Sequence, residues 1–412
     1  MIRWTRAAAA VALALAAPSA ALAFETVDTL PFPSTGAFPA WVADPVGPWS
    51  IFAYGGMMYD SNAFRRPVNE EGDLVARLGA GGRLIQRVIG RQAILLEGYG
   101  EYYDFQDLNE IDHFGYGARG EWLYEIGNNI NGAAGYSRIR RHGDLGEFRI
   151  ERRVMVTTER AFVDGGYRFH PDWRIFGGAE VTRSEDDLGV RPERKTGTLR
   201  SSLTYRTGLG NSIGVEGRWT NGETPVAEEI AGAVGVSDDY EEREVSLVVS
   251  YALGAQLRVG GRVGQTEREY EQFPERNFDG TTYRGTLEWL PTQKIIFAFE
   301  GYHEPASIID VASSHVIRTG QSAGVSWAPG FKLVFTARFV NERRENQGDI
   351  STVVLDTPPR DETLRVWRFG AGWEPARRWQ VGLGLDVGER RSNELGRDYD
   401  YVQVMANVRW TY

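Results

Sequence analysis

Residues 402–412 read VQVMANVRWTY, and their side chains alternate between two kinds. The even positions, from Val402 to Tyr412, are all apolar or aromatic, whereas Gln403, Asn407 and Arg409 fall on odd positions. A period of two indicates a β-strand with one apolar and one polar face. A soluble β-sandwich can contain such a strand, so this stretch alone leaves a soluble and a membrane fold open.

The end of this strand distinguishes it from an ordinary sheet strand. Val408, Trp410 and Tyr412 place the bulky aromatic side chains at the C-terminal end of the apolar face. In an outer-membrane barrel, aromatic residues in this position lie at the boundary of the bilayer. The terminal aromatic also resembles the C-terminal assembly signal of bacterial outer-membrane barrels. We therefore interpret these three residues as a C-terminal barrel signal.

The N-terminal residues indicate export from the cytoplasm. Arg3 and Arg6 precede an apolar run over residues 7–17, and Ala21-Leu22-Ala23 is typical of a cleavage site. The run is too short to span a bilayer as a helix. We expect residues 1–23 to be a signal peptide, residues 24–48 a Pro-rich periplasmic segment, and residues 49–412 the folded barrel.

The composition fits a membrane barrel better than an enzyme. The chain has no Cys and 5 His, but 49 Gly, 18 Tyr and 12 Trp among its 412 residues. Its mean hydropathy of −0.37 is expected for a barrel, whose strands alternate between lipid and water. The net charge of −10 argues against nucleic acid as a partner.

A short turn recurs along the chain. Trp289-Leu-Pro291, Trp327-Ala-Pro329 and Trp373-Glu-Pro375 each place an aromatic residue two positions before a proline, which favours a tight reversal. The spacing of about 40 residues also suits propeller blades. Each interval, however, holds two long alternating stretches rather than four short strands. The turn centres fall near residues 90, 127, 171, 208, 254, 291, 329 and 375.

The connections between these turns are longer, polar and acidic, as at residues 185–187, 221–242, 269–280 and 342–362. Short periplasmic turns that alternate with longer external loops are typical of outer-membrane barrels. The pattern predicts an all-β fold, a single transmembrane antiparallel β-barrel of about 18 strands, with 16–18 compatible with the pattern. Its expected location is the outer membrane of a Gram-negative bacterium.

If the apolar face meets lipid, the polar face lines the lumen. Ion pairs between strands are one interpretation of its charges, and a cationic interior that favours anionic or polyhydroxylated solutes is the other. Arg258, Arg262 and Arg284 share one face, and their expected partners Glu244 and Glu288 are fewer than the cations. We therefore expect residual positive potential there. The lumen-lining candidates are Arg168, Arg174, Arg200, Arg206, Arg218, Arg258, Arg262, Arg284, Arg338, Glu216 and Glu288.

The sequence gives little support for catalysis. No H-E-x-x-H or G-x-S-x-G motif occurs. His303-Glu304 and Ser313-Ser314-His315 are the nearest approach to a rim active site, and polar loop residues explain them more simply. We predict no enzymatic activity, no catalytic residue, no cofactor and no metal.

The repeated unit of an alternating strand, Trp-x-Pro and a second alternating strand resembles the outer-membrane β-barrel porins encoded with bacterial exopolysaccharide biosynthesis genes. Residues 281–303, 319–343 and 365–391 carry this resemblance. The resemblance implies a channel for exopolysaccharide export, or for assembly of the exporter, and a periplasmic polysaccharide-export protein as partner. A general diffusion or anion-selective porin is the alternative, and a barrel that only anchors surface loops is a third class. Outer-membrane lipid, lipopolysaccharide and the barrel-assembly machinery are the other expected partners.

Overall fold

The computed structural model describes residues 48–148, 150–189, 193–223, 239–272, 274, 277–306, 315–347 and 360–412. The expected signal peptide, residues 1–23, and all but the last residue of the Pro-rich segment, residues 24–48, lie outside this part of the chain. The expected barrel begins where the described residues begin.

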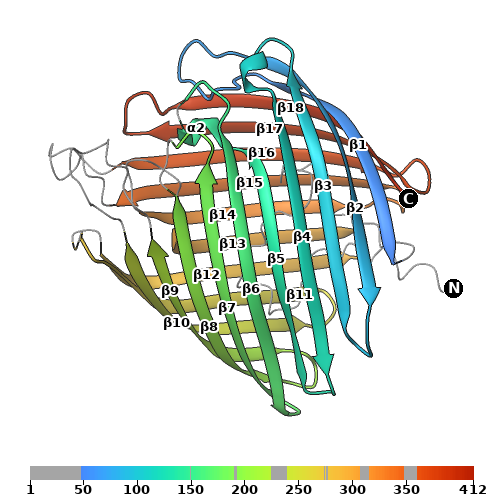
Figure 1. The fold of residues 1–412 in the computed structure, drawn as a ribbon, viewed down its shortest axis with the longest axis vertical. Coiled ribbons are helices and arrows are strands. Elements are labelled where there is room, and N and C mark those ends of the chain that lie inside the picture. Colours follow the sequence, from blue (N-terminus) through green and yellow to red (C-terminus); the bar gives the residue numbers. More distant parts are fainter. Residues whose placement is uncertain are drawn as a thin grey trace.

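Eighteen antiparallel strands follow one another in the sheet in the order of the chain (Figure 1). They are β1 (Trp49–Asp60), β2 (Asp73–Arg87), β3 (Ala93–Phe105), β4 (His113–Ile126), β5 (Ile130–His142), β6 (Met155–His170), β7 (Trp173–Asp186), β8 (Arg194–Arg206), β9 (Ser212–Glu223), β10 (Tyr240–Leu253), β11 (Leu257–Tyr270), β12 (Phe278–Thr292), β13 (Ile295–Ala306), β14 (His315–Trp327), β15 (Leu333–Gln347), β16 (Asp361–Trp373), β17 (Trp379–Ser392) and β18 (Tyr399–Thr411).

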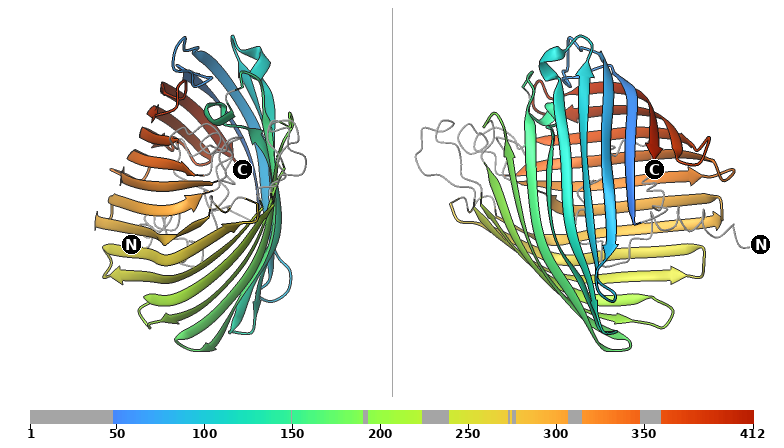
Figure 2. Two further views of the ribbon diagram at one scale, coloured as in Figure 1. Left: turned by 90° about the vertical axis from the view of Figure 1, so that its left-hand side faces the viewer. Right: turned by 45° about the vertical axis from the view of Figure 1, so that its right-hand side comes forward.

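The first and last strands close the sheet into a barrel. Strand β1 pairs with β2 on one side, from Trp49 opposite Leu84, and with β18 on the other, from Phe52 opposite Thr411. Figure 1 shows β1–β9 as the front wall and the later strands behind it, and Figure 2 shows the same two walls from the side. A barrel of this strand number is wide enough for an aqueous channel. The predicted fold class is confirmed.

The alternation of short turns and longer loops is also confirmed. The eight connections at one end of the barrel span residues 88–92, 127–129, 171–172, 207–211, 254–256, 293–294, 328–332 and 374–378. Gly90, Gly127 and Gly254 have φ values of 59°, 61° and 66° in these turns, a conformation that glycine adopts without steric cost. The chain therefore reverses tightly at this end, which we call the periplasmic end.

The strands extend further than the sequence indicated. Residues 221–223, 240–242 and 342–347 were expected in loops but belong to β9, β10 and β15. The turn expected near residue 291 is centred at 293–294, because Pro291 lies within β12. The pairing of β12 with β13 shifts register between Trp289 and Thr292. This irregularity lets the strand hold a proline, which cannot donate to a regular ladder.

The apolar and polar residues of β18 lie on opposite faces of the strand, as predicted. Val404 is 50% exposed and Tyr412 48% exposed on the outer surface, whereas Met405 and Arg409 are 7% and 8% exposed on the inner face. Outward aromatic rings also meet between neighbouring strands near the periplasmic turns, as for Trp327 and Phe335, whose centroids lie 5.6 Å apart. The outer surface is thus an apolar band with an aromatic rim, the pattern that a bilayer stabilises.

Glycine lets inward-facing tyrosines lie flat on the wall of the barrel. A Cβ on Gly320 would lie 2.3 Å from the ring of Tyr302, and one on Gly388 would lie 2.2 Å from the ring of Tyr401. Both contacts join adjacent strands.

Among the described loop residues, two short helices occur, η2 (Asn109–Ile111) and α2 (Leu145–Phe148). Within the described residues, no helix is long and apolar enough to cross a membrane.

Candidate functional site

The inward faces of the strands line the lumen, and ion pairs join neighbouring strands along this face. By strand alternation, all eleven lumen candidates lie on this face. The glutamates that accept most of these pairs, Glu242, Glu244 and Glu304, are almost fully buried. Buried carboxylates of this kind are held in place by paired guanidinium groups.

The arginines of β11 and β12 have more carboxylate partners than the sequence indicated. Arg258 lies 3.6 Å from Glu288, and Arg262 lies 3.5 Å from Glu244, as expected. Arg262 is also 3.5 Å from Glu304 of β13, and Arg284 pairs with Glu304 and with its neighbour Glu300. Strand β13 thus supplies two carboxylates that were not counted in the sequence, and the residual positive potential expected around these three arginines stays a prediction.

The ion pairs continue around this wall in both directions. Arg218 of β9 contacts Glu244, and Arg268 lies 2.5 Å from Glu242. In the other direction Arg318 lies 3.2 Å from Glu304, and Arg338 lies 3.3 Å from Glu300. This connected set of pairs, from β9 to β15, is called the paired wall below. It places charges of both signs along the lumen.

A loop crosses the lumen and ends on the opposite wall. It connects β5 to β6, comprises residues 143–154 without residue 149, and is called the crossing loop below. Glu147 in its helix α2 lies 2.8 Å from Arg344 of β15 and 3.1 Å from Arg390 of β17. These two strands belong to the wall that faces β5 and β6 (Figure 1). The contacts therefore narrow the channel.

The arginines that hold Glu147 each keep a carboxylate on their own wall. Arg344 lies 2.5 Å from Glu342, and Arg390 lies 2.6 Å from Glu362. Arg390 is 2% exposed as a side chain, and Glu362 is 1% exposed. Both arginines are thus paired with a carboxylate of their own wall, independently of the charge of Glu147.

Three loops pack against one another beside this contact. Phe64 of the loop after β1, Ile111 of η2 and Leu145 of α2 form a buried apolar cluster, against which Phe105 and Leu108 pack. We call this set the loop cluster. It fixes the crossing loop by burying apolar surface.

Polar contacts reinforce the loop cluster. Arg66 of the first loop lies 2.7 Å from Glu151 of the crossing loop. This hydrogen bond raises the pKa of the Arg66 guanidinium above its usual value. Asn62, which is fully buried, donates its side-chain amide to the carbonyls of Arg66 and Asp400. The first loop is therefore attached both to β18 and to the crossing loop.

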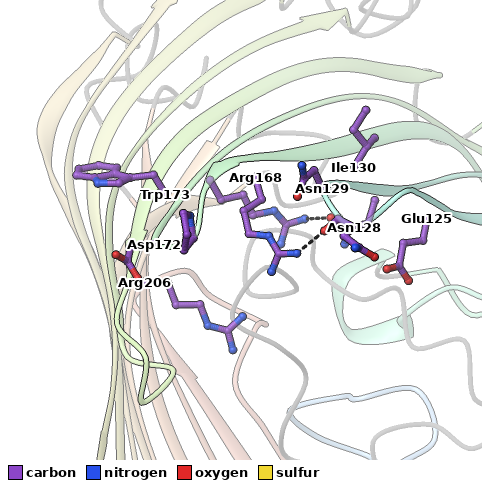
Figure 3. A pocket seen from close by; sticks show the side chains of 11 residues that line it. Glu125, Asn128, Asn129, Ile130, Arg168, Asp172, Trp173 and Arg206 are labelled. Carbon is purple, nitrogen blue, oxygen red and sulfur yellow. Dashed lines mark hydrogen bonds between the residues drawn. The ribbon is translucent and has the colours of Figure 1, made fainter.

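The periplasmic end of the lumen differs from the paired wall. Arg168 of β6, Arg174 of β7 and Arg206 of β8 line a pocket of about 310 Å³ (Figure 3). Arg174 donates to the side-chain oxygen of Asn131 at 2.9 Å, and Arg168 donates to the carbonyl of Asn128. Among the described residues, no carboxylate forms an ion pair with any of these three arginines.

The other lumen candidates are distributed between these regions. Arg200 is buried, with its guanidinium 4.7 Å from the centre of the Phe176 ring. Glu216 lies half-buried on β9, two residues from Arg218. Within the part of the chain that the structure describes, no group of three or more acidic or histidine side chains is arranged to hold a metal ion.

The similarity of this chain to known proteins lies in its fold. No protein-family model matches the chain, and the search of curated proteins found no match. Among solved structures, the chain resembles Pseudomonas aeruginosa OpdK with vanillate, at a TM-score of 0.50 and 10% sequence identity, over 88% of this chain and 99% of OpdK. It also resembles a BenF-like porin from Pseudomonas fluorescens Pf-5, at a TM-score of 0.51 and 9% identity, over 88% of this chain and 99% of that porin.

The chain has the fold of an outer-membrane porin. The closed barrel and its apolar outer surface place it in the outer membrane of a Gram-negative bacterium. At these identities the likeness concerns the fold, and the expected link to exopolysaccharide genes does not follow from it.

Two groups of functional residues were missed in the sequence. Glu300, Tyr302 and Glu304 occupy every second position of β13 and so share one face. The period of two could therefore have placed both glutamates on the lumen face. Glu147 lies in a loop and meets arginines 197 and 243 residues away, for which the sequence carries no local signal.

Proposed function

We propose that this barrel is a passive diffusion channel for small hydrophilic solutes, with a preference for anions. The observation that supports it most is the crossing loop, whose Glu147 reaches Arg344 and Arg390 on the opposite wall. A loop in this position limits the size of a solute that can pass. This proposal corresponds to the alternative drawn from the sequence, a general diffusion or anion-selective porin.

Exopolysaccharide export, the leading expectation from the sequence, is less well supported. A polymer chain needs a continuous open lumen, and here two further loops pack against the crossing loop. The vanillate in the OpdK structure supports the proposal in a limited way, since a barrel of similar fold is associated with a small carboxylate. A periplasmic export protein is not required by a passive channel, whereas bilayer lipid, lipopolysaccharide and the assembly machinery are.

The test is permeation through the full-length mature protein in liposomes. Swelling rates with sugars and organic acids of increasing size should fall steeply beyond disaccharides, and small carboxylates should pass faster than neutral solutes of equal size. Planar bilayers should give discrete conductance steps and a reversal potential that favours anions. Free passage of long dextrans would contradict the proposal and restore the export interpretation, whereas a barrel without any conductance would leave only a role as an anchor for surface loops.

A further inference from the structure

The pocket at the periplasmic end combines positive charge, an inward position and room for a ligand. Arg168, Arg174 and Arg206 come from three consecutive strands and line the same pocket, where Figure 3 shows the side chains of Arg168 and Arg206. Elsewhere in the lumen, the arginines of the paired wall each have carboxylate partners. Arg168 and Arg174 donate instead to a backbone carbonyl and a side-chain amide, neither of which carries a charge.

Two acidic side chains line the pocket, and neither forms an ion pair with its three arginines among the described residues. Glu125 lines the pocket but pairs with Arg91 of the first periplasmic turn. Asp172 also lines it, and its carboxylate lies 3.8 Å from the ring nitrogen of His170. Guanidinium groups that share one pocket repel one another unless an anion compensates them.

The chain makes space for one of these guanidinium groups. A Cβ at position 166 would lie 2.2 Å from the Nε and from a terminal nitrogen of Arg174, so Gly166 allows this side chain to lie across β6. The Nε of Arg174 is buried and has no hydrogen-bond acceptor. One donor of Arg174 is therefore fixed by Asn131, and its Nε is available to a further acceptor.

We propose that this pocket binds small organic carboxylates as they leave or enter the periplasmic end of the channel. Guanidinium groups present paired N–H donors that match the geometry of a carboxylate. The volume of about 310 Å³ lies at the lower end of the range for small-molecule sites, which suits an acid of one ring rather than an oligosaccharide. The inference rests on the proposed function, because it names the class of solute that the channel prefers.

The test uses benzoate as the probe and benzyl alcohol as its uncharged counterpart, with the full-length protein in planar bilayers. In the wild-type channel, benzoate should reduce the ion current in a saturable manner, and benzyl alcohol should not. The triple variant Arg168→Gln, Arg174→Gln, Arg206→Gln should weaken this block at least tenfold and shift the reversal potential towards cations.

A matched control removes the same charge from the outside of the barrel. Arg138, Arg183 and Arg343 point outwards and pair with surface carboxylates, and changing all three to Gln should leave the benzoate block unchanged. Gly166→Ala keeps every charge but displaces the Arg174 guanidinium, and it should weaken the block without altering the single-channel conductance in KCl. Slower gel mobility after boiling would confirm that each variant forms the barrel.

The outcomes separate this inference from the proposed function. A conducting wild-type channel whose benzoate block is equal in the pocket and control triple variants would overturn the pocket assignment and leave the channel intact. If the wild-type barrel does not conduct, saturation-transfer NMR of benzoate with the protein in detergent still tests the pocket. A signal that is lost in the pocket triple variant would then support the site, and a signal that persists would refute it.

Discussion

Replacing Glu147 with Gln should release the crossing loop from the opposite wall. The Glu147 side chain is 13% exposed and accepts from Arg344 at 2.8 Å and from Arg390 at 3.1 Å. Hydrogen bonds to charged groups contribute roughly 1.5–3 kcal/mol each. The amide oxygen of Gln still accepts one of them, and both arginines keep their wall carboxylates. The net loss should therefore be about 2–3 kcal/mol in the equilibrium between attached and released loop.

A change of this size has a measurable consequence for the channel. At about 1.4 kcal/mol for each factor of ten, the population of the released loop should rise roughly 30- to 150-fold. Single-channel recordings should show a larger mean conductance and more frequent transitions between levels. Liposome swelling should show faster entry of trisaccharides, which the attached loop excludes.

The matched control for this variant is Glu345→Gln, which removes an exposed carboxylate that pairs with Arg343 on the outer surface. It should leave conductance and size exclusion at wild-type values. If Glu147→Gln forms a heat-modifiable barrel with the same conductance and the same exclusion limit as the wild type, the crossing loop does not restrict the lumen and the reasoning fails.

Three further predictions follow from other parts of the barrel. Tyr412→Asp should reduce assembly into the outer membrane, measured by heat-dependent gel mobility, because it places a charge on the aromatic rim; assembly at the wild-type level would contradict this. Phe64→Ala should cost about 3–5 kcal/mol of packing in the loop cluster and make the loops more susceptible to trypsin, with the barrel resistant as before. Gly320→Ala should displace the Tyr302 ring and break its hydrogen bond to Glu342, which a lower temperature of heat modification would detect.

The sequence contained enough information for the barrel but not for its interior. Alternation and the Trp-x-Pro turns are local signals, and they sufficed for eighteen strands, for eight turns and for the two faces of β18. Strand ends were less predictable, because β9 and β15 continue beyond the apolar band as polar strands. In these strand ends both faces carry polar residues, so no alternation of apolar and polar residues indicates a strand.

The charge balance of the lumen depends on which strands are neighbours. Arg284 was assigned too few partners because only the carboxylates of its own and preceding strands were counted, whereas Glu300 and Glu304 lie on the following strand. The contact of Glu147 with Arg344 and Arg390 requires the closed barrel, since it joins residues from opposite walls. No periodicity in residues 143–154 could have indicated it.

The arrangement at Glu147 also explains how a channel can hold a loop firmly and still release it. Arg344 stays paired with Glu342, and Arg390 with Glu362, whether or not the loop is attached. Release therefore exposes one carboxylate to water and leaves no buried arginine unpaired, which avoids the large penalty of an isolated buried charge. If the wall arginines had Glu147 as their only partner, release would cost several kcal/mol more and the loop would be a permanent plug. The doubled pairing therefore keeps the wall arginines compensated whether or not Glu147 is in contact with them.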